Sequence, residues 1–307
     1  MQTETGKDPD TILTAGPVEG RWREGRAPAV GPRTRSRGPG AVGRIAGPLT
    51  GLALVLLMAA CAPSRPPRPS ADAVTKRLGL AQLYMDAQKY PQAVTILTEL
   101  AKDDPKNAEI HYNLGVARFG TRDFEGAESS LKEAIRLDPR RTDANYYLGA
   151  AYYAQHKNEL ALQEFRRVLD DPASTARDQA YLSTAILYDE MGNVEEAMKN
   201  AQLAIEANPK FYPAHYELAV LLDRLDRTRE ALEEYEIAAP DYASDSNYHY
   251  RVGVAYFRDG RFDRARDHLV KVTETVPGTE KAKKAKEFLD LIAAGKSAQA
   301  PSGREGR

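Results

Sequence analysis

One spacing constrains this chain more than any other feature: small residues recur every 34 or 36 positions along its middle. They are Ala81, Gly115, Gly149, Ala185, Ala219 and Gly253. Twelve positions after each of them stands an alanine: Ala93, Ala127, Ala161, Ala197, Ala231 and Ala265. A fixed period of this length indicates a repeat architecture, in which each unit buries its apolar face only by stacking on its neighbours.

Apolar side chains within each unit recur at helical spacing. In the third unit, Leu148 and Tyr152 are four residues apart, and Ala161, Phe165 and Val168 follow at intervals of four and three. Prolines close several units, and a proline after a helix stops it: Pro105, Pro139, Pro172, Pro209 and Pro277. The pattern predicts an all-α chain with two helices per unit. In the fifth unit, Pro240 predicts an early helix end and an irregular turn over residues 240–246.

The period and its small residues resemble the tetratricopeptide repeat. The resemblance implies an α-solenoid of six helix-turn-helix repeats over residues 74–277. Residues 278–293 are expected to form a capping helix, because alanines and large apolar side chains share one face and lysines the other. The tryptophan usual in the first helix of such repeats is absent; its places hold Arg77, His111, Asn145, Tyr181, His215 and His249.

The two ends of the chain have a different composition. Residues 1–44 are rich in Gly, Pro and Arg, so we expect this extension either to be disordered or to precede the true start of translation; Arg44 gives it a basic flank. Residues 45–60 are mostly apolar and uncharged, and they have the length of an export-signal core rather than of a transmembrane helix. We expect residues 294–307 to be a disordered tail.

The single cysteine, Cys61, follows two alanines at the end of the apolar run. This arrangement resembles the bacterial lipoprotein signal, in which such a cysteine is lipidated and becomes the first residue of the mature chain. The Pro-rich residues 61–73 would then be a tether that holds the repeats off a membrane. Because Ala62 follows the cysteine, the resemblance implies an outer-membrane lipoprotein facing the periplasm.

Charge and motifs exclude several classes of function. Lys and Arg number 43 against 44 Asp and Glu, which argues against a strongly basic nucleic-acid binder. The chain has no phosphate loop, no Gly-rich dinucleotide turn and no His-Glu-x-x-His motif, so we expect no enzymatic activity and no cofactor. His111, His215 and His249 share one repeat position. A metal held between His215 and His249 is one interpretation; we prefer imidazoles that fill the space of the missing tryptophan, and no metal.

In tetratricopeptide proteins the first helices line a concave groove that binds partners. By that register an aromatic and aliphatic channel, with acid in its later half, is expected here. The predicted partner-binding residues are Tyr112, Val116, Phe119, Tyr146, Ala150, Tyr153, Ile186, Tyr216, Val220, Tyr250, Val254 and Phe257. Such a channel suits an extended or helical segment of another protein.

Two functions remain open from the sequence. The first is a non-enzymatic scaffold that helps to assemble an envelope complex, similar in architecture to the lipoproteins that pilot type IV pilus secretins. The second is a module that binds glycan, or the machinery of peptidoglycan synthesis or exopolysaccharide export, since Tyr faces can stack on sugar rings.

Overall fold

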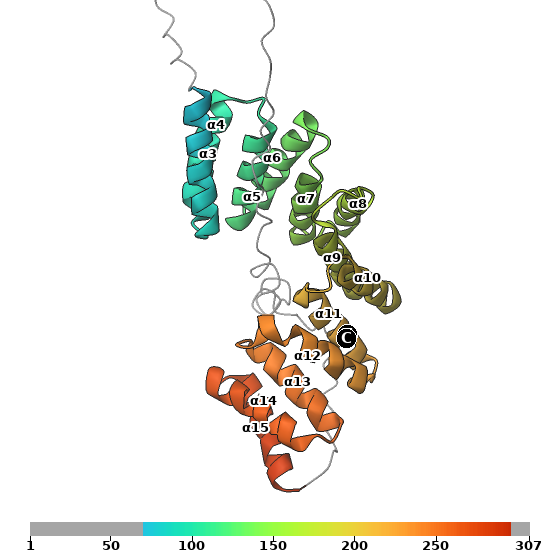
Figure 1. The fold of residues 1–307 in the computed structure, drawn as a ribbon. Coiled ribbons are helices and arrows are strands. Elements are labelled where there is room, and N and C mark those ends of the chain that lie inside the picture. The colour runs from blue at the N-terminus through green and yellow to red at the C-terminus, as the bar shows by residue number, and fades with distance from the viewer. Residues whose placement is uncertain (1–69, 296–307) are drawn as a thin grey trace, which may run out of the picture. The chain divides into compact units, whose positions relative to one another are not determined.

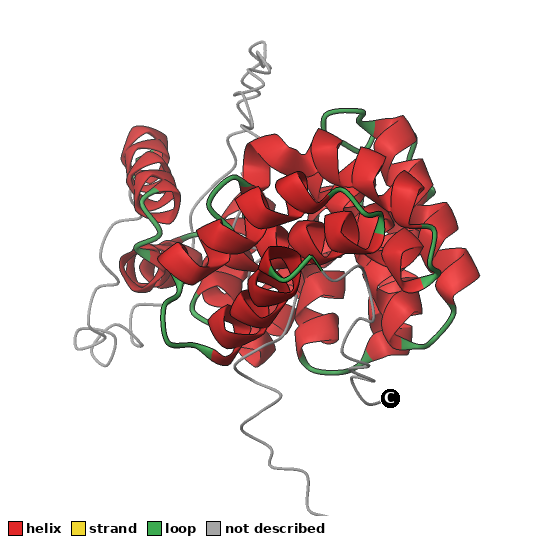
Figure 2. Ribbon diagram, turned by 90° about the horizontal axis from the view of Figure 1, so that it is seen from below, coloured by secondary structure: helices red, strands yellow, loops and turns green. Residues whose placement is uncertain are grey.

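The computed structural model describes residues 70–295, and within this range the chain is helical with no strand (Figures 1 and 2). Twelve of its helices form six consecutive pairs, and a thirteenth follows them. The pairs are α3 (Ala71–Asp86) with α4 (Tyr90–Asp103), α5 (Ala108–Gly120) with α6 (Phe124–Leu137), α7 (Thr142–Ala154) with α8 (Asn158–Leu169), α9 (Arg177–Glu190) with α10 (Val194–Ala207), α11 (Tyr212–Arg224) with α12 (Thr228–Tyr242), and α13 (Ser246–Arg258) with α14 (Phe262–Thr275).

The helix that follows the pairs is α15 (Glu280–Ala293). It packs on α14 and α13, and Ala282, Ala285 and Phe288 are among its buried residues. The hydroxyl of Thr279 accepts a hydrogen bond from the Ala282 amide at 3.2 Å, which caps the first turn. The prediction of an all-α solenoid of six repeats with a terminal capping helix is therefore confirmed.

Small residues allow the two helices of a repeat to approach closely. All six alanines that follow the small residues by twelve positions are fully buried. The partner of Gly149 is Phe165 of α8, whose ring would lie 2.7 Å from a Cβ placed on the glycine. Gly115 stands in the same way against Leu131. At these two glycines an added Cβ would require the facing side chain to move, so the close approach of the two helices favours a small residue there.

The turn inside each repeat has the same backbone form. Its second residue lies in the left-handed region in all six repeats, and in two of them this residue is glycine. The φ angles are 57° at Gln88, 65° at Arg122, 58° at His156, 80° at Gly192, 57° at Asp226 and 78° at Gly260. Four turns therefore hold a side chain in a conformation that favours glycine.

The expected early end of the fifth repeat is wrong. Helix α12 continues through Pro240 to Tyr242. The ring of Tyr242 stacks on that of Tyr216, with centroids 4.5 Å apart, and it also lies 5.8 Å from the Tyr248 ring. These ring contacts keep the last turn helical although Pro240 cannot donate a backbone hydrogen bond.

Candidate functional site

The first helices of neighbouring repeats touch one another. Close pairs are α5 with α7 and α9 with α11, and α13 touches the capping helix α15 in the same way, whereas no second helices within residues 70–295 pair as closely. We call the surface formed by α5, α7, α9, α11 and α13 the first-helix face. This face contains the predicted groove residues.

Seven of the twelve predicted groove residues are buried in the free chain, so their expected exposure is wrong. They are Tyr112, Tyr146, Ala150, Ile186, Tyr216, Val220 and Phe257. The remaining five are partly exposed: Val116, Phe119, Tyr153, Tyr250 and Val254. Of the predicted groove, the accessible side chains therefore lie in two places, one on α5 and α7 and one on α13.

Ring contacts explain why the tyrosines are buried. The Tyr146 ring lies 6.0 Å from that of Phe165 in α8 and 5.3 Å from that of Tyr147. Tyr216 stacks on Tyr242, and Phe257 packs against Phe288 of α15 with centroids 5.1 Å apart. These side chains join helices to one another, so they stabilise the repeats instead of offering a contact surface.

Tyr147 is a residue that the sequence reasoning missed. It stands one position after the predicted row, is half-buried, and its ring makes edge contacts with Tyr112 at 6.0 Å and Phe119 at 6.1 Å. Burial, together with the nearby Tyr90 and Asp143, raises the pKa of Tyr147 to about 12. Its hydroxyl therefore stays protonated at neutral pH and can donate a hydrogen bond.

The partly exposed apolar and aromatic side chains of α5 and α7 are Val116, Phe119, Tyr147 and Tyr153, which we call the aromatic patch. The rings of Phe119 and Tyr147 are in contact, and the Tyr153 hydroxyl donates a hydrogen bond to Glu190 of α9. Phe119 also packs edge-on against Phe124, with centroids 5.5 Å apart. Aromatic side chains of this kind bury a large apolar area at a low cost in side-chain entropy, which suits a contact surface.

Ion pairs bridge the later first helices. Asp189 of α9 pairs with Arg224 of α11, and Asp223 of α11 pairs with Arg258 of α13 at 2.9 Å. In each pair the arginine stands 35 positions after the aspartate, so the same contact recurs one repeat further on. The acid expected in the later half of the channel is therefore paired with arginine from the next repeat.

Asp223 is nearly buried, and its Oδ1 atom has no hydrogen-bond partner among the described residues. Burial raises the pKa of Asp223, while Arg258 and Arg251 oppose this change. An arginine partner on one oxygen offsets part of the cost of burying the carboxylate. The later part of the first-helix face is thus a charged joint between repeats.

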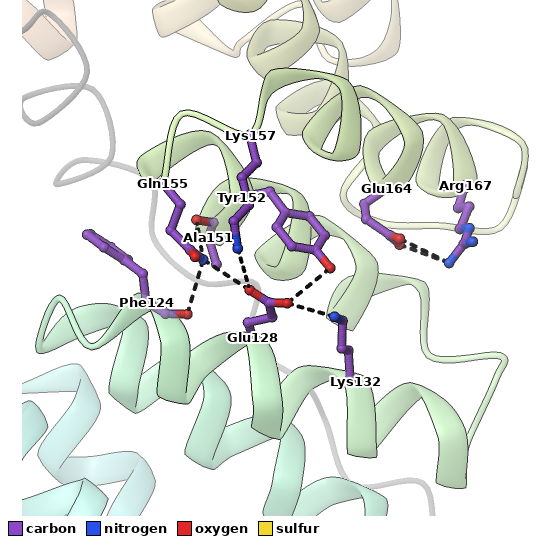
Figure 3. A network of polar contacts seen from close by, with 9 residues as sticks. All are labelled: Phe124, Glu128, Lys132, Ala151, Tyr152, Gln155, Lys157, Glu164 and Arg167. Atoms are coloured by element: carbon purple, nitrogen blue, oxygen red, sulfur yellow. Dashed lines mark hydrogen bonds and ion pairs between the residues drawn. The ribbon is translucent and has the colours of Figure 1, made fainter.

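A network of polar contacts centred on Glu128 joins α6 to α7 and to the start of α8 (Figure 3). From α6, the Glu128 carboxylate accepts hydrogen bonds from Lys132 at 2.6 Å, from Lys157 at 3.2 Å and from Gln155 at 3.4 Å. The Tyr152 hydroxyl of α7 donates at 3.4 Å. Burial raises the pKa of Glu128, but the hydrogen bonds from the two lysines outweigh it and hold this pKa below its usual value. The network ties α7 to α6.

The histidines that share a repeat position each bond a backbone carbonyl six residues earlier. The Nε2 atoms of His111, His215 and His249 face the carbonyl oxygens of Pro105 at 3.0 Å, Pro209 at 3.2 Å and Ala243 at 2.8 Å. Because a carbonyl only accepts, each Nε2 donates. The imidazoles therefore tie the start of a repeat to the preceding loop.

The other ring nitrogen of two histidines contacts the second helix of the same repeat. Nδ1 of His215 lies 2.6 Å from Glu234, and Nδ1 of His249 lies 3.0 Å from Nδ1 of His268. His215 and His249 thus bond to different partners. No group of three metal-ligating side chains occurs within residues 70–295.

The fold and this face define a repeat protein that presents helical surfaces to partners. A tetratricopeptide-repeat model matches residues 78–139, 117–177, 182–246 and 216–277. The chain belongs to the tetratricopeptide-repeat family, whose members generally act as scaffolds for protein interaction. No curated protein sequence matches it.

Solved structures with a similar fold include two pilus proteins. PilF of Pseudomonas aeruginosa is 18% identical, with a TM-score of 0.65 over 70% of this chain and 97% of PilF. PilW, a widely conserved type IV pilus biogenesis factor, is 19% identical, with a TM-score of 0.62 over 71% of this chain and all of PilW. The Cut9–Hcn1 complex of the APC/C is also similar, with a TM-score of 0.61 at 15% identity; the match covers 71% of this chain and 42% of that chain. At these identities the likeness shows the fold.

The sequence features that predict the localisation of the chain lie outside the described residues. They are the extension over residues 1–44, the apolar run over residues 45–60 and Cys61. No helix within residues 70–295 combines the length and apolarity needed to cross a bilayer.

Proposed function

We propose that this chain is a non-enzymatic scaffold, anchored to the outer membrane through a lipid on Cys61, that assists assembly of an envelope complex of the pilus or secretin type. The observation that carries the scaffold function is the aromatic patch, which leaves apolar side chains accessible on a rigid helical face. The architecture of the chain and the fold shared with PilF and PilW support the pilus-type assignment.

In this proposal the aromatic patch holds an apolar segment of a pore subunit. Phe119 and Tyr153 supply apolar area, and the protonated Tyr147 hydroxyl donates a hydrogen bond to the partner's backbone or to a polar side chain. The Glu128 network keeps α7 in place relative to α6, so little conformational entropy is lost when the partner binds. The lipid would then carry the bound pair to the membrane.

The anchor is tested by the intact mass of the mature protein from a Gram-negative host, with Cys61→Ala as the control. The proposal predicts an acylated chain that begins at Cys61 and fractionates with membranes. A soluble protein that retains residues before Cys61 would contradict the proposed anchoring to the outer membrane.

The patch is tested by capture of a secretin-type pore subunit on immobilised protein. Replacing Phe119 and Tyr153 together by Ala should weaken capture by about 2 kcal/mol or more if they are hot spots. Leu160→Ala is the matched control, because Leu160 is also exposed but lies on the second helix α8. Equal loss in both variants, or no loss in either, would argue against the patch.

A further inference from the structure

The first helix of the first repeat carries two exposed leucines at positions whose equivalents in the later repeats are buried. Leu80 is 44% and Leu83 is 65% exposed. The residues aligned with Leu80 in the later repeats are at most 7% exposed: Leu114, Leu148, Thr184, Leu218 and Val252. The residues aligned with Leu83 are fully buried: Ala117, Ala151, Leu187, Leu221 and Ala255.

The cause of this difference is the preceding helix. In repeats two to six, the first helix packs against the second helix of the repeat before it, as α7 does on α6. For α3 no such helix exists within residues 70–295, so no described helix covers the surface that would receive it. We call this surface, formed by Lys76, Leu80, Leu83 and Asp86, the α3 face.

The charged residues of the α3 face are complementary to those of a second, antiparallel copy of the same face. Lys76 precedes Leu80 by four residues, Asp86 follows Leu83 by three, and all four side chains are exposed. At 3.6 residues per turn they fall within about 120° of the helix circumference. The midpoint of Lys76 and Asp86 is at residue 81, and the midpoint of the two leucines lies within about 1 Å of it along the helix axis.

We propose that the α3 face is the contact of a two-fold symmetric dimer of this chain, in which two α3 helices pack antiparallel. One axis at residue 81 places Leu80 opposite the partner copy's Leu83, and Lys76 opposite the partner copy's Asp86. Two-fold symmetry repeats each contact, so the dimer has two leucine contacts and two ion pairs. A parallel arrangement would instead place lysine beside lysine.

One helix pair buries less than the roughly 800 Å² per partner of a standard stable interface. The dimer is therefore weak in solution, and the ion pairs at its rim set the antiparallel register more than its strength. This inference concerns a different surface from the aromatic patch and does not rest on the proposed function.

Sedimentation equilibrium of the full chain over a wide concentration range tests the dimer. Lys76→Glu and Asp86→Lys each create two like-charge contacts per dimer, so each should weaken association about tenfold at low salt. The double variant Lys76→Glu/Asp86→Lys restores opposite charges and should return association to within about twofold of the original chain.

A fourth variant tests the apolar contact. Leu83→Gln should abolish association, whereas Leu225→Gln, at a leucine that is 46% exposed on another repeat, should leave it unchanged. Because Lys76, Leu83 and Asp86 are exposed, these substitutions leave the fold intact, and unchanged circular dichroism would show it. A monomeric chain at all concentrations would overturn the proposal. Association that ignores the charge reversals, or that the double variant fails to restore, would also overturn it.

Discussion

Gly149→Ala tests the close packing of the two helices of a repeat. The new Cβ would lie 2.7 and 2.8 Å from two carbons of the Phe165 ring, where ordinary contacts are 3.4 Å or more. Phe165 is fully buried against Tyr146, so the ring cannot turn away. Overpacking of this kind costs about 1–3 kcal/mol, while replacing glycine by alanine within a helix gains about 0.5–1 kcal/mol. The expected net loss of unfolding free energy is about 1 kcal/mol.

Gly79→Ala is the matched control, because a Cβ at Gly79 in α3 meets no atom within 4 Å. This variant should gain the free energy of replacing glycine by alanine within a helix, without the cost of overpacking. The two variants should then differ by about 1–3 kcal/mol, which corresponds to about 0.5–1.5 M in the urea midpoint for a slope of about 2 kcal/mol/M. Urea unfolding followed by circular dichroism in dilute protein measures this difference. Equal midpoints would refute the register of the helix pair.

Three further perturbations follow from single contacts. Asp226→Gly should raise the unfolding free energy by up to about 1 kcal/mol and Gly192→Ala should lower it by about as much, since both residues have positive φ. Two shifts of the urea midpoint of the same sign would contradict this. Burial, with His249 next in importance, lowers the pKa of His268 to about 4, so the folded chain binds fewer protons than the unfolded one between pH 6.5 and 4. The unfolding free energy should therefore fall by about 1–2 kcal/mol as pH drops through this window, after allowance for the partial exposure of His268. His268→Gln should flatten this part of the plot of unfolding free energy against pH, and an unchanged plot would refute the assignment. Glu128→Gln should lower stability by about 0.5–1.5 kcal/mol, because it removes the charge that pairs with two half-exposed lysines at the joint. Added salt should shrink the difference from the original chain, and a variant as stable as the original would contradict this.

The repeat architecture could be predicted because its signal is local. A small residue such as Gly149 and an alanine such as Ala161 must recur wherever two helices approach closely, whatever the neighbouring repeat contains. The sequence therefore determined the number of repeats, the helix pairs and the capping helix. It placed His111 in the space of the missing tryptophan, but its hydrogen bond to the Pro105 carbonyl is known only from the structure.

The exposed part of the first-helix face could not be predicted in the same way. Whether Tyr146 or Tyr216 is exposed depends on rings supplied by other helices, such as Phe165 and Tyr242, and the spacing within one repeat does not reveal them. Tyr147 lies one position off the expected row, so a strict register omits it. The continuation of α12 through Pro240 likewise depends on tertiary stacking, which overrides the local preference of proline to end a helix.

Site-specific photo-cross-linking in cells of the natural host tests the central claim most directly. A photoreactive amino acid would replace Phe119 or Tyr153 in the aromatic patch, and Leu160 on α8 would serve as the control position. The account predicts cross-links from both patch positions to one envelope protein of the pore or secretin type, identified by mass spectrometry, and none from position 160. Cross-links to cytosolic proteins, or equal yields from all three positions, would contradict it.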